Sequence, residues 1–134
     1  MGSVCEERPQ VITHKLNESI GGHYDEDREG AVFGDIPLVF FVTDDGDNRY
    51  SLCAQSFDGS WMNTVPVLPE QTDEYYSESV LFLLVTYPDI NIEQLRSLVN
   101  SHPPLKEIVD RVSVARYTIR DPHVRRVFCA LTVG

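Results

Sequence analysis

The feature that most constrains the fold is a nearly continuous apolar run at residues 36–43, with the sequence IPLVFFVT. Its length and its strand-forming side chains favour a buried central strand over a helix. The polar segment DDGDN (44–48) follows, and residues 49–57 then show a two-residue alternation. This order predicts a hairpin with a five-residue polar loop, so the chain is expected to build its core on a β-sheet.

A second turn signal, Asp58-Gly59, separates residues 49–57 from a further segment at about residues 60–67. Aspartate and glycine accept the positive φ angles of a two-residue hairpin turn. The pair therefore predicts a third strand, which stops near Pro66. The three strands together make an antiparallel meander.

Three later segments also have the composition of strands. Residues 80–87 (VLFLLVTY) are apolar over the length of a buried strand. Residues 114–120 and 124–133 each alternate, and the turn RDPH (120–123) lies between them, so they predict a closing hairpin.

Two helices are predicted between these strands. Asn91 with Gln94 three residues later matches a capping box, so a helix is expected to start directly after Asn91. Pro103-Pro104 ends that helix and starts a second one, because proline is favoured at the first helical position. The second helix has a single apolar stripe, made by Leu105, Ile108, Val109 and Val112.

The predicted fold is α+β: a single domain over residues 1–134, with a mostly antiparallel sheet of five to six strands and two helices packed on one face. Residues 1–10 are expected to be a loose N-terminus. No apolar run approaches the ~20 residues that span a membrane, and the polar start lacks the apolar region of a secretory signal. Three cysteines do not make a disulfide framework, so we expect an intracellular, cytoplasmic protein, with a nuclear location left open.

The net charge of −10 at pH 7 is unevenly distributed along the chain. Residues 1–79 hold 16 acidic and 4 basic side chains, whereas residues 80–134 hold 5 acidic and 7 basic ones. General binding to nucleic acid is disfavoured, because phosphate neutralisation needs lysine and arginine. An acidic surface suits a basic protein partner, and the alternative is that the acidity serves only solubility. The asymmetry also permits self-association, with a basic surface of one copy against acids of another.

The candidate partner-binding residues are acids and the aromatics among them. The acids are Asp25, Glu26, Asp27, Glu29, Asp44, Asp45, Asp47, Asp73 and Glu74. Aromatic side chains rimmed by charge are typical anchors of interfaces, and here they are Trp61, Tyr75 and Tyr76. The alternative is that these aromatics fold back on the core.

A second candidate surface would bind an anion through arginines. Arg116 and Arg120 share one face of the predicted strand 114–120, and Arg126 joins them if the hairpin register aligns the two faces. Phe128 shares the Arg126 face of the next strand and would stack on a base. The alternative is that these arginines pair with the protein's own carboxylates.

Metal and catalytic motifs are not found. GGHYDEDREG (21–30) has no second His or Cys nearby for zinc, and its spacing fails the calcium-loop pattern, as does that of DDGDN. The chain has no phosphate-binding glycine loop, no nucleophile elbow and no H-E-x-x-H. Cys53 and Cys129 lie in apolar segments, where cysteine is usually a small hydrophobe. We therefore expect no metal, no cofactor and no catalytic residue, and we expect GGHYDEDREG to be a mobile acidic loop.

The sequence favours a non-enzymatic interaction protein whose acidic surface engages a basic protein partner. Small inhibitors, immunity-type proteins and viral accessory factors work in this way. The first alternative is an RNA or phosphate-ligand binder that uses the arginine-bearing sheet face. The second is a small enzyme whose site is assembled from scattered residues.

Overall fold

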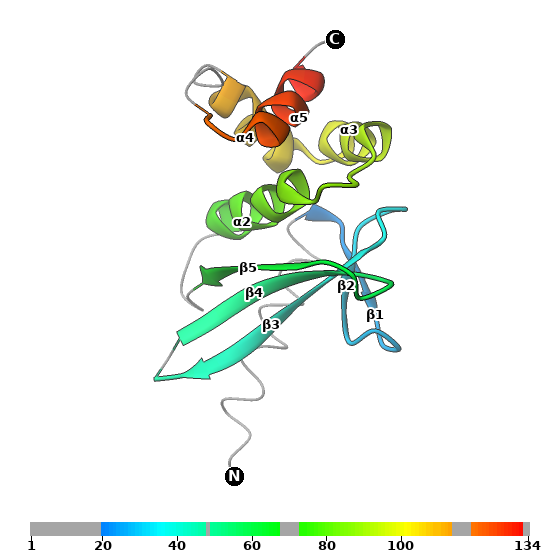
Figure 1. The fold of residues 1–134 in the computed structure, drawn as a ribbon, viewed down its shortest axis with the longest axis vertical. Helices are drawn as coiled ribbons and strands as arrows, with labels where there is room; N and C mark the ends of the chain where they lie inside the picture. The colour runs from blue at the N-terminus through cyan, green and yellow to red at the C-terminus, as the bar shows by residue number, and fades with distance from the viewer. Residues whose placement is uncertain (1–19, 48, 68–72, 114–118, 133–134) are drawn as a thin grey trace.

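The computed structural model describes residues 20–47, 49–67, 73–113 and 119–132. Within these ranges the chain forms one five-stranded antiparallel sheet, and the helices α2 to α5 lie on one side of it (Figure 1). The predicted α+β class and antiparallel sheet are confirmed, and the described residues include four helices, α2 to α5, where the sequence predicted two. The expected loose N-terminus lies outside the described residues.

The strands pair in sequence order, each antiparallel to the next. Their bounds are β1 His23–Asp25, β2 Gly30–Val32, β3 Leu38–Gly46, β4 Arg49–Ser56 and β5 Met62–Val67. The meander of β3, β4 and β5 confirms the three strands that were predicted from the apolar run at 36–43, the alternation at 49–57 and the Asp58-Gly59 turn. The prediction of a five-residue loop at 44–48 is wrong, because the pairing of β3 with β4 continues to Gly46, which lies opposite Arg49.

The apolar run at 80–87 belongs mainly to helix α2, Asp73–Thr86, and is not a strand. α2 lies between the sheet and the helices α3 (Ile92–Ser101), α4 (Pro103–Ser113) and α5 (Pro122–Thr132) (Figure 1). It contacts β4 and β5 below and α4 and α5 above. A helix covered on two sides shows no one-sided apolar stripe, and a short apolar run fits a buried helix as well as a buried strand.

The core is centred on α2 and the sheet face that it covers. On that face β3 contributes Leu38, Phe40 and Val42, and β4 contributes Tyr50, Leu52 and Ala54, all of them buried. From α2 the largest fully buried side chains are Tyr76, Leu81, Leu83 and Leu84. This two-sided burial of α2 fixes the position of the sheet under the helical layer.

Helices α3 and α4 confirm the capping and stripe predictions. The side chain of Asn91 accepts a hydrogen bond from the backbone N–H of Gln94 at 3.1 Å, as an N-cap does. The predicted stripe of α4 packs into the core, through Leu105, Ile108, Val109 and Val112. Of the helices in the described ranges, none combines the length and the apolar character needed to cross a membrane.

The predicted closing hairpin is wrong over residues 122–132, which form helix α5, and residues 114–118 lie outside the described ranges. Asp121 caps this helix, since its Oδ1 accepts the backbone N–H groups of His123 at 2.9 Å and Val124 at 3.1 Å. Pro122 takes the first helical position. The inward stripe has helical spacing and consists of Val124, Val127, Phe128 and Leu131.

Candidate functional site

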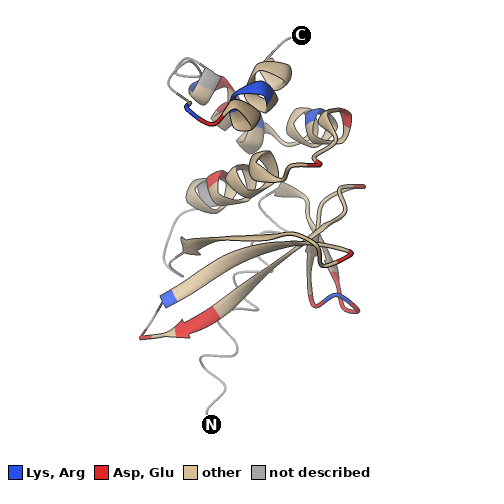
Figure 2. Cartoon of the chain, viewed as in Figure 1, with Lys and Arg blue, Asp and Glu red and all other residues tan. Residues whose placement is uncertain are grey.

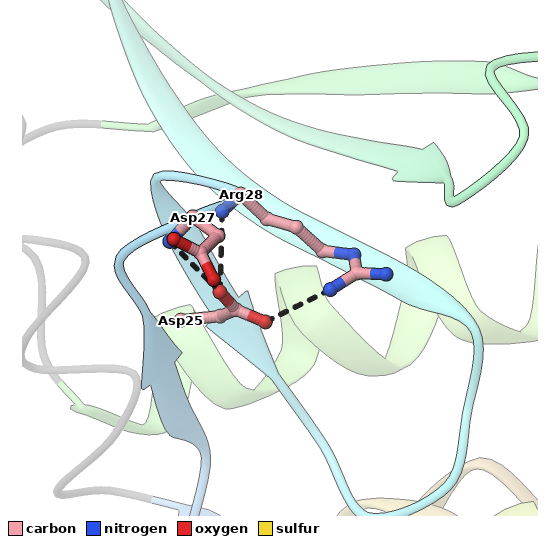
Figure 3. Close-up of polar contacts among 3 residues, drawn as sticks. All are labelled: Asp25, Asp27 and Arg28. Carbon is pink, nitrogen blue, oxygen red and sulfur yellow. Dashed lines mark hydrogen bonds and ion pairs between the residues drawn. The ribbon is translucent and has the colours of Figure 1, made fainter.

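The segment GGHYDEDREG contains a hairpin, so the prediction of a loop was wrong. β1 and β2 pair from His23 opposite Val32 to Asp25 opposite Gly30. Oδ1 of Asp25 accepts the backbone N–H groups of Asp27 at 2.9 Å and Arg28 at 3.2 Å, and Oδ2 accepts from the Arg28 guanidinium at 3.0 Å (Figure 3). Side-chain acceptance of this kind closes an Asx turn. Glu26, Asp27 and Glu29 are exposed around it.

Hydrogen bonding keeps Asp25 ionised in this turn. The hydrogen bond from the backbone N–H of Arg28 is the largest effect, and it lowers the pKa of the Asp25 carboxyl below its ordinary value. Burial opposes it, and the hydrogen bond from the Arg28 guanidinium lowers the pKa further. Asp25 therefore has a structural role, whereas Glu26, Asp27 and Glu29 present the charge of the turn.

The β1–β2 turn lies beside the turn that joins β4 to β5. The guanidinium carbon of Arg28 lies 3.9 Å from the ring centroid of Phe57. The predicted Asp58-Gly59 turn is in place but wider than two residues, since β4 ends at Ser56 and β5 begins at Met62. Hydrogen bonds from the Ser60 hydroxyl and N–H and from the Ser56 hydroxyl lower the pKa of Asp58 to about 2.

The tip of the β3–β4 hairpin holds the second group of acids, Asp44, Asp45 and Asp47, all exposed. A bulge interrupts the β3–β4 register between Asp44 and Gly46. The carboxylate of Asp45 accepts hydrogen bonds from the hydroxyls of Thr43 at 3.1 Å and Ser51 at 2.5 Å, so its direction is fixed. Figure 2 shows acids at this tip and at the β1–β2 turn, at opposite ends of the sheet. The predicted acidic surface is therefore divided into two.

A cavity of about 380 Å³ lies beside the β3–β4 tip, and we call it the tip cleft. It is lined by Asp45, Arg49, Tyr50, Ser51, Pro66, Val67 and Tyr75. The hydroxyl of Tyr75, from the first turn of α2, donates to the carbonyl of Pro66 at 3.3 Å. The tip cleft thus joins an acid and an aromatic that the sequence predicted separately. Sequence reasoning missed Arg49, Ser51 and Pro66 as lining residues, because only the strand register brings Ser51 opposite Pro66.

Among the described side chains, the other aromatic and acidic residues that were predicted to bind a partner do not line the tip cleft. Tyr76 is fully buried, so its predicted exposure to a partner was wrong: consecutive helical residues point in different directions, and Tyr76 points into the core. The ring of Trp61 is partly buried and lies 5.0 Å from that of Tyr87, centroid to centroid. Asp73 and Glu74 begin α2, and their side chains are outside what the structure describes.

The arginines do not form the predicted sheet face within the described residues. Arg116 lies outside them, and Arg120 precedes α5. On helix α5, Arg126 is exposed while Phe128 is buried, because residues two apart lie on opposite sides of a helix. Anion binding by Arg120 or Arg126 stays a prediction, now without the aromatic partner that would stack on a base.

Cys53 lies on the outer sheet face next to the tip acids. Its Sγ is 4.0 Å from the hydroxyl of Thr43, and the side chain is buried. Burial raises the pKa of the Cys53 thiol above its ordinary value. The hydrogen bond with the Thr43 hydroxyl lowers this pKa, and the Asp45 carboxylate raises it. A thiol in this state is a poor nucleophile at neutral pH.

We expect the Cys53 thiol to react roughly tenfold or more slowly than free cysteine at pH 8. Asp45→Asn removes a negative charge, so it lowers the pKa of the thiol, increases the thiolate fraction and makes the reaction faster. Reaction with a disulfide reagent, in a chain that carries Cys5→Ser and Cys129→Ser, measures both rates.

Asp27→Asn is the matched control, because it removes one charge at the other end of the sheet. Asp27→Asn is expected to leave the rate of Cys53 unchanged. Equal acceleration by Asp45→Asn and Asp27→Asn would contradict a local effect of the Asp45 carboxylate.

A second cavity, of about 410 Å³, lies between α3 and the loop that joins β2 to β3. Asp35, Glu93, Ser97 and His102 are among its lining residues. Glu93 pairs with Arg96 at 3.0 Å, and no hydrogen bond joins the side chains of Asp35, Ser97 and His102. In the described ranges no three His, Cys, Asp or Glu side chains converge in a metal-binding arrangement. This cavity therefore presents no assembled acid–base pair.

Comparison of the chain with protein-family models, with curated proteins and with solved structures found no match. Among the predicted site residues in the described ranges, the tip cleft is the place where an acid and an aromatic meet.

Proposed function

We propose that this protein is a non-enzymatic interaction protein that binds a basic segment of a partner protein in the tip cleft. The observation that carries the proposal is the meeting of Asp45 and Tyr75 around one cavity of about 380 Å³. A carboxylate attracts an ammonium or guanidinium group, and an aromatic ring adds a cation–π contact. A lysine or arginine side chain of the partner is the group that this pair of residues suits.

The remaining acids of the tip support capture of such a partner. Asp44 and Asp47 are exposed beside Asp45, and the chain as a whole carries a charge of −10. Charge of one sign attracts an oppositely charged partner over distance, and salt weakens this attraction. Each exposed ion pair contributes little by itself, so the cleft has to supply the specificity.

Arg49 allows a second test of the proposal, because its charge is opposite to that of Asp45. It lines the same cavity as Asp45, so its positive charge opposes the binding of a basic side chain. Arg49→Gln is expected to strengthen binding roughly threefold, and Asp45→Asn to weaken it by a similar factor. Net charge and the charge that lines the cleft both change by one unit in each variant, in opposite directions for the two variants.

The experiment measures the dissociation constant of a fluorescent peptide rich in lysine and arginine, by anisotropy at low and high salt. Two variants each lose three negative charges, one group at the tip and the other at the β1–β2 turn. The tip variant is Asp44→Asn, Asp45→Asn and Asp47→Asn, and the turn variant is Glu26→Gln, Asp27→Asn and Glu29→Gln. We expect the tip variant to bind roughly tenfold more weakly and the turn variant to lose less than about threefold.

Because the two variants have the same net charge, their difference isolates the tip cleft from general attraction. Equal weakening by both variants would show that only net charge matters and would remove the cleft from the proposal. Failure of the native protein to bind the peptide at low salt would reject the proposed function as a whole.

A further inference from the structure

The strands β1 and β5 are the two edges of the sheet. Among the described residues β5 pairs with β4 on one side and with no strand on the other, and we call that other side the free edge of β5. An unpaired edge presents a row of N–H and C=O groups with which a strand of another molecule can pair. β1 is only three residues long and offers little to such a strand, whereas β5 has six residues, with the sequence MNTVPV.

The strand register shows which backbone groups of β5 face the free edge. The N–H of Ser56 donates to the carbonyl of Trp61 at 2.9 Å, so these two residues are a hydrogen-bonded pair of the β4–β5 ladder. Such pairs recur at every second residue of an antiparallel ladder, and the register therefore directs the backbone groups of Asn63 and Val65 toward β4. The residues whose backbone groups face the free edge are Met62, Thr64 and Pro66.

Two of these three residues do not offer a full set of backbone groups to another strand. The N–H of Thr64 donates to Oδ1 of Asn63 at 2.9 Å. Pro66 has no N–H, and its carbonyl accepts the hydrogen bond of the Tyr75 hydroxyl at 3.3 Å. A strand that paired along the whole free edge would have to break both hydrogen bonds, and it would meet a proline that cannot donate.

Helix α2 holds the side chains that make these two hydrogen bonds. It contacts β5, and Tyr75 comes from its first turn (Figure 1). At the last residue of α2, Oγ1 of Thr86 accepts a hydrogen bond from Nδ2 of Asn63 at 3.2 Å, which leaves Oδ1 of the same amide to accept from Thr64. The two ends of one helix therefore fix the Asn63 and Tyr75 side chains beside β5.

We propose that Asn63, Pro66 and Tyr75 close the free edge of β5, and that this closure keeps two copies of the chain from pairing through their β5 strands. Two copies of one edge strand can pair antiparallel about a two-fold axis, which would join the two sheets into one. Prolines and occupied backbone groups on an edge strand oppose such pairing. This inference goes beyond the proposed function, because it concerns the backbone groups of β5 and not the charges of the tip cleft.

The experiment opens the edge and measures self-association. The open-edge variant carries Asn63→Ala, Pro66→Thr and Tyr75→Phe, which free the N–H of residue 64, add an N–H at residue 66 and free the carbonyl of residue 66. Sedimentation velocity over a wide range of concentration is expected to show the native chain as a monomer. The open-edge variant is expected to dimerise at least about tenfold more tightly than the native chain, and hydrogen exchange in the dimer should show new protection of the amides of residues 62 and 64.

Thr64→Pro, added to the open-edge variant, is the matched control. The N–H of residue 64 faces the free edge, so a proline there removes this donor without breaking a hydrogen bond to β4. The control is therefore expected to restore the monomer, although it keeps the three substitutions of the open-edge variant.

Other results would overturn the proposal. An open-edge variant that associates no more tightly than the native chain shows that these three residues do not keep the copies apart. Association that Thr64→Pro does not reverse, or that leaves the amides of residues 62 and 64 unprotected, uses a contact other than the β5 edge.

Circular dichroism shows whether each variant is folded. If the open-edge variant is not folded, Pro66→Thr alone provides the test, with a smaller increase in association expected and the absence of any increase overturning the proposal. Peptide binding by the native chain tests the proposed function and does not involve the free edge, so the two proposals fail separately.

Discussion

Leu84→Ala is expected to lower the free energy of unfolding by about 3–4 kcal/mol, close to the middle of the range for fully buried leucines. Leu84 is 0% exposed in α2, the helix with the sheet on one side and α4 and α5 on the other. Truncation removes buried apolar contacts and leaves a cavity that two packed layers surround. Since a domain of this size is stable by only about 5–15 kcal/mol, the variant loses a large part of its stability.

Urea denaturation, followed by circular dichroism, measures this loss. Phe82→Ala is the matched control, because it truncates a larger side chain two residues away on the same helix that is 48% exposed. The control is expected to lose less than half as much as Leu84→Ala, at concentrations where the chain is monomeric. Equal losses would contradict the position of α2 between two packed layers.

The parts of the fold that sequence reasoning predicted are those whose signals are local. The β3–β4–β5 meander follows from the apolar run at 36–43, from the alternation at 49–57 and from Asp58-Gly59, where Gly59 has a φ of +74°. The start of α3 follows from one side-chain hydrogen bond, that between Asn91 and Gln94. Such signals involve residues a few positions apart, so they are visible without tertiary structure.

α5 had the same kind of local signal and was nevertheless predicted as a strand. Val124, Val127, Phe128 and Leu131 repeat at helical spacing, and Asp121-Pro122 is a good helix start. Residues 124–133 also alternate, and this second pattern predicts a strand. The capping side chain is the better guide here, because Asp121 satisfies two backbone N–H groups that a strand would not leave open.

α2 and the tip cleft depend on contacts between residues far apart in the sequence, which no short stretch of sequence reveals. The polar first half of α2 and its apolar second half are one helix only because the sheet and the helical layer cover it from two sides. Asp45 and Tyr75 line one cavity because β4 and β5 carry the chain back to the tip, in a register that puts Ser51 opposite Pro66. The sequence therefore predicted which acidic residues are candidates for partner binding. It did not predict that they lie at two opposite ends of the sheet.

Gly30→Ala is expected to lower the free energy of unfolding by about 2–3 kcal/mol, because β2 passes too close to β3 for any side chain. A Cβ at Gly30 would lie 2.5 Å from the carbonyl oxygen of Phe40 and 2.6 Å from Cγ2 of Val39. The Val39 methyl group can move, but the carbonyl belongs to the sheet backbone. The substitution therefore pushes β2 off β3, and with it the whole β1–β2 turn.

Hydrogen exchange locates this effect, since amides of β1 and β2 should lose protection while those of β4 keep theirs. Gly34→Ala is the control: its φ of +55° strains alanine by about 1 kcal/mol, but nothing lies within 4 Å of the added Cβ. Adding Val39→Ala to Gly30→Ala removes the methyl contact and leaves the contact with the Phe40 carbonyl. Recovery of native protection in β1 and β2 by that double variant would contradict this explanation. It would show that the Val39 side chain excludes a Cβ at residue 30, and that the close approach of the β2 and β3 backbones does not.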